Sequence, residues 1–164
     1  MSAVISPCGL YRYELRRVLA GDGVGQCVFV MLNPSTADAE TDDPTVRRCI
    51  NFAHLWGCSE LVVVNLFAFR ASSPKDMMAA GDPVGPENDR YIAWANESAR
   101  MVVCAWGAHG GWRGRDREVL RVINAGPASQ LMSLGFTKDG HPRHPLYVRR
   151  DAELVAMFAS PAKP

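Results

Sequence analysis

The sequence predicts an α/β domain with a parallel sheet and right-handed crossovers. Four apolar runs have the composition of strands that are buried on both faces, and they lie at residues 27–32, 60–69, 100–106 and, more weakly, 129–135. Segments with helical periodicity lie between these runs, and this alternation of strands and helices is typical of βαβ units.

The first element expected is an outer strand over residues 10–20, where apolar and polar residues alternate. Leu15 to Leu19 also fit a helix, so both readings stay open. The glycine-rich stretch at 21–25 is a turn, which allows a hairpin into the apolar run that begins at Cys27.

Helices are expected between the apolar runs. In residues 43–57, Asp43 is the expected N-cap, Pro44 the first-turn proline and Gly57 the stop. One face of this helix would carry Val46, Cys49, Ile50, Ala53 and Trp56. Further helices are expected at 86–99, at 112–126 and, capped by Asp151, at 151–159.

Length and composition predict one domain over residues 1–164, with frayed ends at 1–8 and 160–164. The hydrophobic content of 48% is enough for a packed core, and the net charge is only +1. A charge this small neither indicates nor excludes DNA, so any contact with DNA would come from local clusters. Two arginine clusters are equally compatible with phosphate binding and with solvated surfaces: Arg113, Arg115, Arg117 and Arg121; and Arg143, Arg149 and Arg150.

Five cysteines occur without any C-x-x-C pair, so zinc and iron–sulfur signals are absent, and we expect neither a metal nor a cofactor. The odd cysteine count, with no secretory signal, predicts a reducing, cytoplasmic location. No apolar run approaches the length of a membrane span, and no strongly exposed apolar face argues for a dimer. A monomer that does not bind membranes is therefore expected.

Ligands of parallel α/β sheets bind at the carboxyl ends of the strands, so the residues after each apolar run are the candidate site. Asn33 follows the first run and can donate and accept hydrogen bonds in a turn that Pro34 stiffens. An Asx turn that merely closes the strand is the alternative. Asn65 interrupts the second run, where a buried amide must bind either the neighbouring backbone or a ligand.

The two remaining strand ends carry glycines and histidines. Trp106 and Gly107 open the stretch WGAHGG, which lacks the lysine of a phosphate loop and the spacing of a dinucleotide motif. His141 and His144 each precede a proline after the last run, so their loop is stiff. Two histidines within four residues favour a functional loop, but they are too few ligands for a metal site.

In this order, the residues at the four strand ends resemble motifs of the uracil-DNA glycosylase superfamily. Its strands end in motifs such as G-I-N-P-G, L-L-L-N, L-W-G and H-P-S-P. The matching stretches are residues 31–35, VVVNL with Asn65, CAWGAHG, and RHPLY with His144. The chain also resembles, over nearly its whole length, a bacterial and phage domain family of unknown function. The hallmarks of that family match LNPSTAD, DPTVRRC, VVNL and HPLY at 32–38, 43–49, 63–66 and 144–147.

The glycosylase resemblance implies a three-layer α/β/α sandwich with a short four-stranded parallel sheet, to which an N-terminal strand or hairpin is added. It also implies hydrolysis of the N-glycosidic bond of a flipped uracil or modified base in single- or double-stranded DNA. Asn33 would hold the water, Asn65 would pair with the base, and His144 would hydrogen-bond the base carbonyl. Asn33 is not a base, so a nearby carboxylate would have to help, and Asp42 is the freer candidate because Asp43 is expected to cap a helix.

The same resemblance suggests the remaining contacts with substrate. Leu146 and Tyr147 would wedge into the stack, and Ser35 would contact phosphate. Further contacts are expected from Phe67 by stacking, from Trp106 and Gly107 at the third strand end, and from Arg143 and Arg70 to DNA, although Arg70 could simply close an ion pair. The alternatives are a non-catalytic binder of a modified base, an enzyme of free nucleosides or nucleotides, and a plain α/β domain whose motifs are turns and caps.

Overall fold

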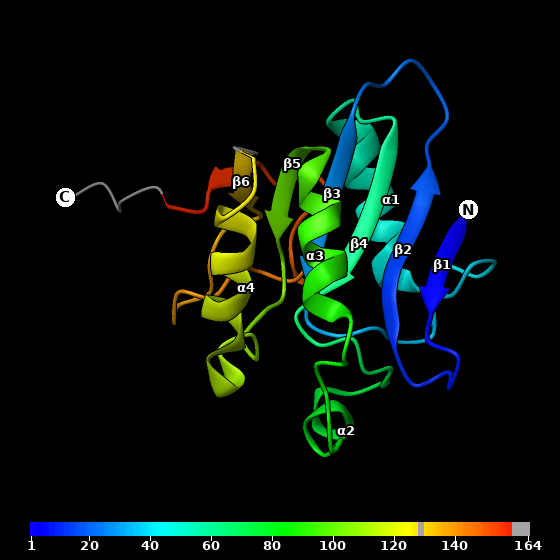
Figure 1. The fold of residues 1–164 in the computed structure, drawn as a ribbon. Coiled ribbons are helices and arrows are strands. Elements are labelled where there is room, and N and C mark those ends of the chain that lie inside the picture. Colours follow the sequence, from blue (N-terminus) through cyan, green and yellow to red (C-terminus); the bar gives the residue numbers. More distant parts are fainter. Residues whose placement is uncertain (128–129, 159–164) are drawn as a thin grey trace.

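A seven-stranded mixed sheet with helices on its faces forms the computed structural model, which describes residues 1–127 and 130–158 (Figure 1). The strands are β1 (Ser2–Ile5), β2 (Arg12–Val18), β3 (Gln26–Met31), β4 (Glu60–Asn65), β5 (Ala99–Cys104), β6 (Gln130–Ser133) and β7 (Val155–Ala156). The helices are α1 (Pro44–Leu55), α2 (Pro74–Met78), α3 (Asn88–Glu97) and α4 (Arg115–Asn124), with short 3-10 turns η1 (Trp112–Gly114) and η2 (Pro145–Tyr147). The predicted α/β class is therefore confirmed.

The order of the strands is β1-β2-β4-β3-β5-β6-β7. The middle strands β4, β3, β5 and β6 are parallel, and they correspond to the four apolar runs. The expected N-terminal strand or hairpin is present as β1 and β2, which extend one edge in antiparallel pairing. A sheet of four parallel strands is nevertheless wrong for the whole, because the sheet is mixed and has seven strands, with β7 antiparallel at the other edge. The short edge strands β1 and β7 are not buried on both faces, so they lack the continuous apolar signal of the middle strands.

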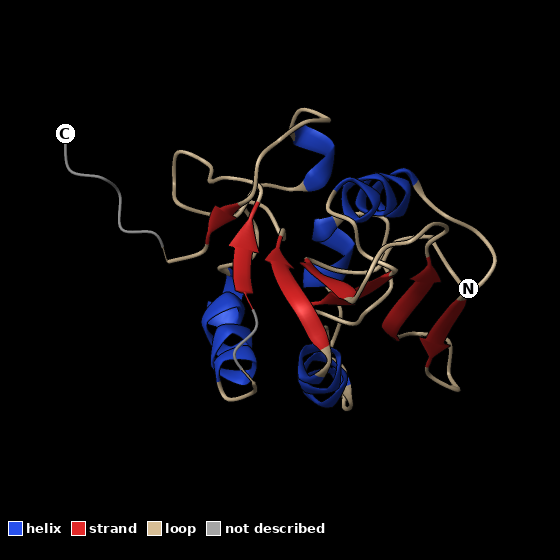
Figure 2. Ribbon diagram, turned by 90° about the horizontal axis from the view of Figure 1, so that it is seen from above, coloured by secondary structure: helices blue, strands red, loops and turns tan. Residues whose placement is uncertain are grey.

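Helices cover both faces of the sheet (Figure 2). On one face, Phe29 and Val63 pack with Phe52 of α1 in one buried cluster. On the other face, Val30 packs with Ile92 of α3 in a second cluster, to which α4 also contributes. Because successive residues of β3 point to opposite faces, both faces of this strand are apolar, which explains its unbroken hydrophobic run.

Helix α1 forms as its sequence predicts. The side chain of Asp43 accepts a hydrogen bond from the backbone N–H of Val46 at 2.8 Å, and Pro44 opens the first turn. Gly57 follows the last turn with a φ of 67°, a left-handed conformation that glycine adopts without strain. The helix thus has fixed ends, and Asp43 is held at its N-terminus.

Both chain ends differ from expectation. The predicted helix at 151–159 is wrong over its described part, where Val155 and Ala156 pair with the edge strand β6. Backbone pairing with an open strand edge outweighs a short helical pattern here. The expected fraying of residues 1–8 is also wrong, because β1 pairs with β2, while 160–164 lie outside the described residues. Residues 12–18 are a strand, which resolves the alternative left open for Leu15 to Leu19.

Candidate functional site

A cavity of about 820 Å³ lies at the carboxyl end of the parallel strands. The chain leaves β3 for β4 on one side and then returns to β5 on the other, so the strand order reverses beside β3. Ligands of open α/β sheets bind at such a reversal. Of the residues expected from sequence to form the site, those that line the cavity are Asn33, Ser35, Asn65, Trp106, Gly107, Arg143, His144 and Tyr147.

Asn65 is the last residue of β4, and its side chain lines this cavity although it is only 1% exposed. Neither Nδ2 nor Oδ1 has a hydrogen-bond partner in the described part of the chain. The backbone carbonyl of Asn65, by contrast, accepts from Nδ2 of Asn88 at 2.9 Å. A fixed backbone thus presents an unpaired donor and an unpaired acceptor to the cavity, where a buried amide without partners costs free energy.

Asn33 combines a structural bond with a free acceptor. Its Nδ2 donates to the carbonyls of Pro34 at 3.0 Å and Ala71 at 2.8 Å, which uses both amide hydrogens. The bond to Ala71 joins the turn after β3 to the segment after β4. Oδ1 accepts no hydrogen bond from the described residues and remains available to a ligand or a water on the cavity side.

His144 lies at the start of η2 and is half-buried. Its Nδ1 accepts a hydrogen bond from the backbone N–H of Leu146 at 3.3 Å. Burial lowers the pKa of His144 below its ordinary value of 6.5, and the negative charge of Asp43 opposes this shift only in part. The neutral ring therefore carries its proton on Nε2, which makes this atom a hydrogen-bond donor.

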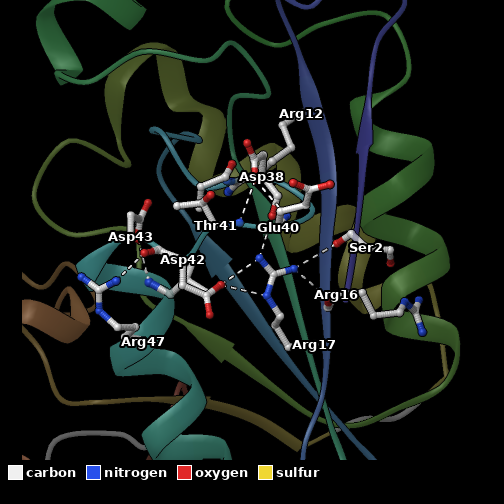
Figure 3. A network of polar contacts seen from close by, with 12 residues as sticks. Ser2, Arg12, Arg16, Arg17, Asp38, Glu40, Thr41, Asp42, Asp43 and Arg47 are labelled. Carbon is white, nitrogen blue, oxygen red and sulfur yellow. Dashed lines mark hydrogen bonds and ion pairs between the residues drawn. The ribbon is translucent and has the colours of Figure 1, made fainter.

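Among the described residues, Asp43 is the carboxylate that lines the cavity, whereas the sequence favours Asp42. Figure 3 shows Asp42 paired with Arg17, whose Nε lies 2.8 Å from the Oδ1 of Asp42. Asp43 lines the cavity and acts electrostatically on His144 and on Arg12. The sequence predicts a helix cap at Asp43, and this cap uses its Oδ1. The second oxygen has no such bond, so one residue can cap the helix and face a ligand.

Trp106 forms one wall of the cavity at the end of β5. It is 2% exposed, and its Nε1 has no partner among the described residues. Gly110 is needed beside it, because a Cβ at that position would lie 1.9 Å from Cδ1 of the indole. The backbone N–H of Gly107 donates to the carbonyl of Pro142 at 2.9 Å. This bond joins the glycine stretch to the histidine loop. Because the N–H of Gly107 is used in it, this group is not available to bind an anion.

Phe67, Arg70, Asp42 and Leu146 are outside the cavity lining. Phe67 is 1% exposed and packs against Trp112 at a ring distance of 5.4 Å, so it is core. Arg70 donates from Nη1 to the carbonyl of Gly9 at 3.2 Å. Leu146 is exposed beside Tyr147, and the ring of Tyr147 contacts that of His144 at 5.5 Å.

The arginine cluster on α4 is partly structural. Arg115 is 3% exposed, and its Nε donates to the carbonyl of Leu66 at 2.8 Å. It also pairs with Asp89 and, at 3.2 Å, with Glu118. This side chain therefore braces the segment that follows Asn65 rather than presenting a charge to a ligand.

Sequence reasoning missed Arg12, which lines the cavity from β2 and is 2% exposed. Strict alternation places Arg12 on the same side as Glu14 and Arg16, both of which belong to a partly exposed ion-pair network. A bulge at Tyr13 in β2 moves Arg12 to the other side of the sheet. No pattern in the residues of this strand predicts the bulge. Thr45, Ser72 and Lys138 also line the cavity without having been singled out.

A family model matches residues 12–146, which begin at Arg12 and end at Leu146. The chain belongs to the family described as Protein of unknown function (DUF1643). The DUF1643 match contains every cavity residue named above except Tyr147, and it excludes the edge strands β1 and β7. No curated protein and no solved structure matches the chain.

Within 1–127 and 130–158, no three His, Cys, Asp or Glu side chains gather where they could hold a metal ion. Each described helix is too short or too polar to cross a membrane.

Proposed function

We propose that this chain recognises a nucleobase in the cavity and hydrolyses the N-glycosidic bond of a flipped uracil or modified base in DNA. The observation that carries the proposal is the amide of Asn65, buried and unpaired at the cavity wall. An amide presents a donor and an acceptor side by side, and the Watson–Crick edge of a base presents the complementary pair. A cavity of about 820 Å³ is within the range of small-molecule sites.

The chemistry requires a donor for the departing base. Cleavage of the C1′–N bond leaves its electron pair on the base, and the negative charge gathers on a base carbonyl. The Nε2 proton of neutral His144 can hydrogen-bond that carbonyl without being transferred, which is a preorganised electrostatic role. The lowered pKa of His144 supports this role, because the ring is a neutral donor at physiological pH.

The other half of the reaction requires a water and an anion. Sugar C1′ becomes oxocarbenium-like as the base leaves, and a carboxylate nearby stabilises that positive charge. Asp43 supplies the carboxylate, and Oδ1 of Asn33 supplies an acceptor that can orient a water. The water oxygen adds to C1′, one of its protons passes to Asp43, and the departing base finally takes up a proton.

The exposed side chains on the loop around His144 favour DNA as the substrate in this proposal. Tyr147 is 81% exposed and Leu146 is 44% exposed, and both lie in the short turn that begins after His144. Apolar and aromatic side chains that stand beside a base pocket can fill the gap left by a flipped base. Arg143, which is exposed on the same loop, can contact a phosphate. The resemblance to the uracil-DNA glycosylase superfamily agrees with this arrangement.

The test is strand cleavage after alkali treatment of end-labelled oligonucleotides. Each carries one uracil, thymine mismatch, hypoxanthine or hydroxymethylated pyrimidine, in single-stranded and duplex form. Cleavage at one base should fall at least about 100-fold with Asn65→Ala or His144→Ala, in line with removal of an electrostatic donor. The matched control is Asn51→Ala, which changes an exposed asparagine of α1 outside the cavity. Absence of any abasic product, with protein in excess over DNA, would overturn the hydrolase assignment for these bases.

A second candidate is a protein that binds a modified base or nucleotide without cleaving it. The use of both Nδ2 hydrogens of Asn33 within the loop favours it, since that residue is then less free to move with a reacting water. Binding of a modified nucleoside that depends on Asn65, without product formation over many hours, would support this candidate. Salt separates the ligands, because duplex binding weakens steeply with salt and nucleoside binding does not.

A further inference from the structure

Arg12 is a buried cation without a carboxylate partner at ion-pair distance among the described residues. Its Nη1 donates to the carbonyl of Ala37 at 2.7 Å, but Nε is buried and donates to nothing in that part of the chain. The side chain lines the cavity. Burying a guanidinium without a counterion costs free energy, so its retention here suggests that the missing partner is a ligand.

A bulge in β2 directs Arg12 to the cavity. Val4 and Ile5 are consecutive in β1, but they pair with Glu14 and Arg12, so Tyr13 is an extra residue in β2. Tyr13 stacks on Tyr91 of α3, with ring centroids 5.1 Å apart, on the face opposite α1. Side-chain alternation restarts after such an insertion. Arg12 therefore reaches the α1 side, where Ala37 and Asp43 lie, instead of the side it would occupy in a regular strand.

The charges around Arg12 leave its own charge largely uncompensated. Asp43 and Asp38 favour the protonated guanidinium, while Arg70 and Arg17 disfavour it, and burial is the largest influence. Together they lower the pKa of Arg12 to about 10, so the group is still a cation at neutral pH. Asp38 and Arg17 have other partners: Asp38 accepts backbone N–H groups of Glu40 and Thr41, and Arg17 is paired with Asp42.

Arg12 and Asn65 lie on neighbouring strands at the same end of the sheet. β2 pairs with β4, and the backbone N–H of Arg12 donates to the carbonyl of Ala68, just beyond the end of β4. Arg12 is level with Ala68 rather than with Asn65, so the two side chains line one cavity at different heights along the strands. The hydroxyl groups of Ser35 and Ser72 line the same cavity and add neutral donors.

We propose that Arg12 is an anion subsite of the cavity and binds the phosphate of a nucleotide whose base is held at Asn65. This inference rests on the proposed recognition of a base and adds the class of substrate, a nucleoside 5′-phosphate unit. The phosphate belongs either to a free monophosphate or to the DNA strand beside a flipped nucleotide. A guanidinium binds either one through paired N–H donors, and Nε and Nη2 form such a pair.

The experiment measures binding by calorimetry to the intact chain at fixed salt. The ligands are deoxyuridine and thymidine, their 5′-monophosphates, 2-deoxyribose 5-phosphate, inorganic phosphate, and a single-stranded oligonucleotide with one deoxyuridine. Each ligand is tested with the wild type, with Arg12→Met and with Arg16→Met. Arg16 is the matched control, because it lies on the same strand in an ion pair with Glu14 and Glu60 outside the cavity.

We expect a monophosphate to bind at least about tenfold more tightly than its nucleoside, a gain of about 1.4 kcal/mol. Arg12→Met should remove that gain, and Arg16→Met should keep it. If the monophosphates bind more tightly than the oligonucleotide, the natural ligand is a free nucleotide. If the oligonucleotide binds more tightly, the natural ligand is DNA. The proposal is overturned if the phosphate does not increase the affinity of the wild type for any ligand. It is also overturned if folded Arg12→Met keeps the increase in affinity.

The same titrations separate this subsite from the proposed base site. If 2-deoxyribose 5-phosphate binds through Arg12 while bases add nothing, the anion subsite stands and the recognition of a base fails. If nucleosides bind through Asn65 and the phosphate adds nothing, the base site stands and the anion subsite fails. Circular dichroism and thermal unfolding of Arg12→Met verify that the variant is folded in either case.

Discussion

Arg48 of α1 holds both ends of the short turn η2 that follows His144. Its Nη2 donates to the carbonyl of Val148 at 2.6 Å. Nε of the same guanidinium donates to the carbonyl of Pro145 at 3.2 Å, and the group lies over the ring of Phe52 at 5.1 Å. One side chain therefore joins the DPTVRRC helix to the HPLY segment. Because Asp43 begins that helix and His144 begins that segment, Arg48 fixes their relative position.

Replacing Arg48 should loosen this arrangement. Hydrogen bonds to charged groups contribute about 1.5–3 kcal/mol, so Arg48→Ala should lower the free energy of unfolding by about 2 kcal/mol. Hydrogen exchange should rise at the backbone amides of 146–148, and binding of ligand at His144 should weaken. Arg47→Ala is the control, since Arg47 is the exposed neighbour and its side chain donates to the carbonyl of Asp42 rather than to the segment after His144. Unchanged exchange at 146–148 in Arg48→Ala would contradict the positioning role.

The two neighbouring aspartates should separate stability from activity. Asp43→Asn retains a good N-cap, so the free energy of unfolding should change by less than about 1 kcal/mol while activity is lost. Asp42→Asn leaves the buried guanidinium of Arg17 without its carboxylate, which should cost about 2 kcal/mol while activity persists. Chemical denaturation and the oligonucleotide assay measure the two effects. Loss of activity in folded Asp42→Asn, with active Asp43→Asn, would restore Asp42 as the catalytic carboxylate.

Local signals explain which parts of the fold were predictable. The parallel strands are continuous apolar runs, and α1 has a capping aspartate, a first-turn proline and a terminal glycine, so each is specified by its own residues. Asn33, Asn65, Trp106 and His144 were found for the same reason: each stands at the end of such an element, where parallel strands bring residues together.

The missed features depend on residues that are distant in sequence. The bulge at Tyr13 arises from pairing with β1 and from the stack on Tyr91, neither of which residues 10–20 contain, so Arg12 could not be assigned to the cavity. Strand β7 exists only because β6 offers an open edge. The sequence favours Asp42 because Asp43 is expected to cap a helix, and the pairing of Asp42 with Arg17 of another strand cannot be seen in the local sequence.

The pH dependence of stability should report the neutral state of His144. Its folded pKa lies below the unfolded value of 6.5, so the unfolded chain binds the proton more readily. The stabilisation is therefore fully present above pH 6.5 and is lost as the pH falls through the lower folded pKa. Thermal unfolding from pH 8 to pH 5 should show a steeper loss of Tm in the wild type than in His144→Gln. Parallel curves would show that the histidine titrates alike in both states.

Gly110 should be intolerant of any side chain. A Cβ there would lie 1.9 Å from Cδ1 and 2.4 Å from Nε1 of Trp106, so the indole must leave its place in the cavity wall. Overpacking of this kind costs about 1–3 kcal/mol, and we expect Gly110→Ala to lower stability within that range and to abolish ligand binding. Gly81→Ala is the control, because nothing lies within 4 Å of its added Cβ. Calorimetric unfolding and tryptophan fluorescence measure both variants.

Asn65 should show opposite effects on stability and on binding. Its side-chain amide is buried without partners, and such a group costs about 1–3 kcal/mol, so Asn65→Leu should raise the free energy of unfolding by about 1–2 kcal/mol. The same change removes the donor and the acceptor from the cavity, so base binding and cleavage should be lost. Denaturant titration and calorimetry on one protein preparation measure both quantities.

Asn88→Leu provides the contrast for this last substitution. Asn88 is equally buried, but its Nδ2 donates to the carbonyls of Asn65 at 2.9 Å and Leu66 at 3.0 Å. Its replacement leaves two buried carbonyls with fewer donors and should therefore destabilise the fold. If Asn65→Leu instead destabilises the chain as much as Asn88→Leu does, the amide of Asn65 supports the fold. The cavity would then lose the residue on which recognition of a base depends.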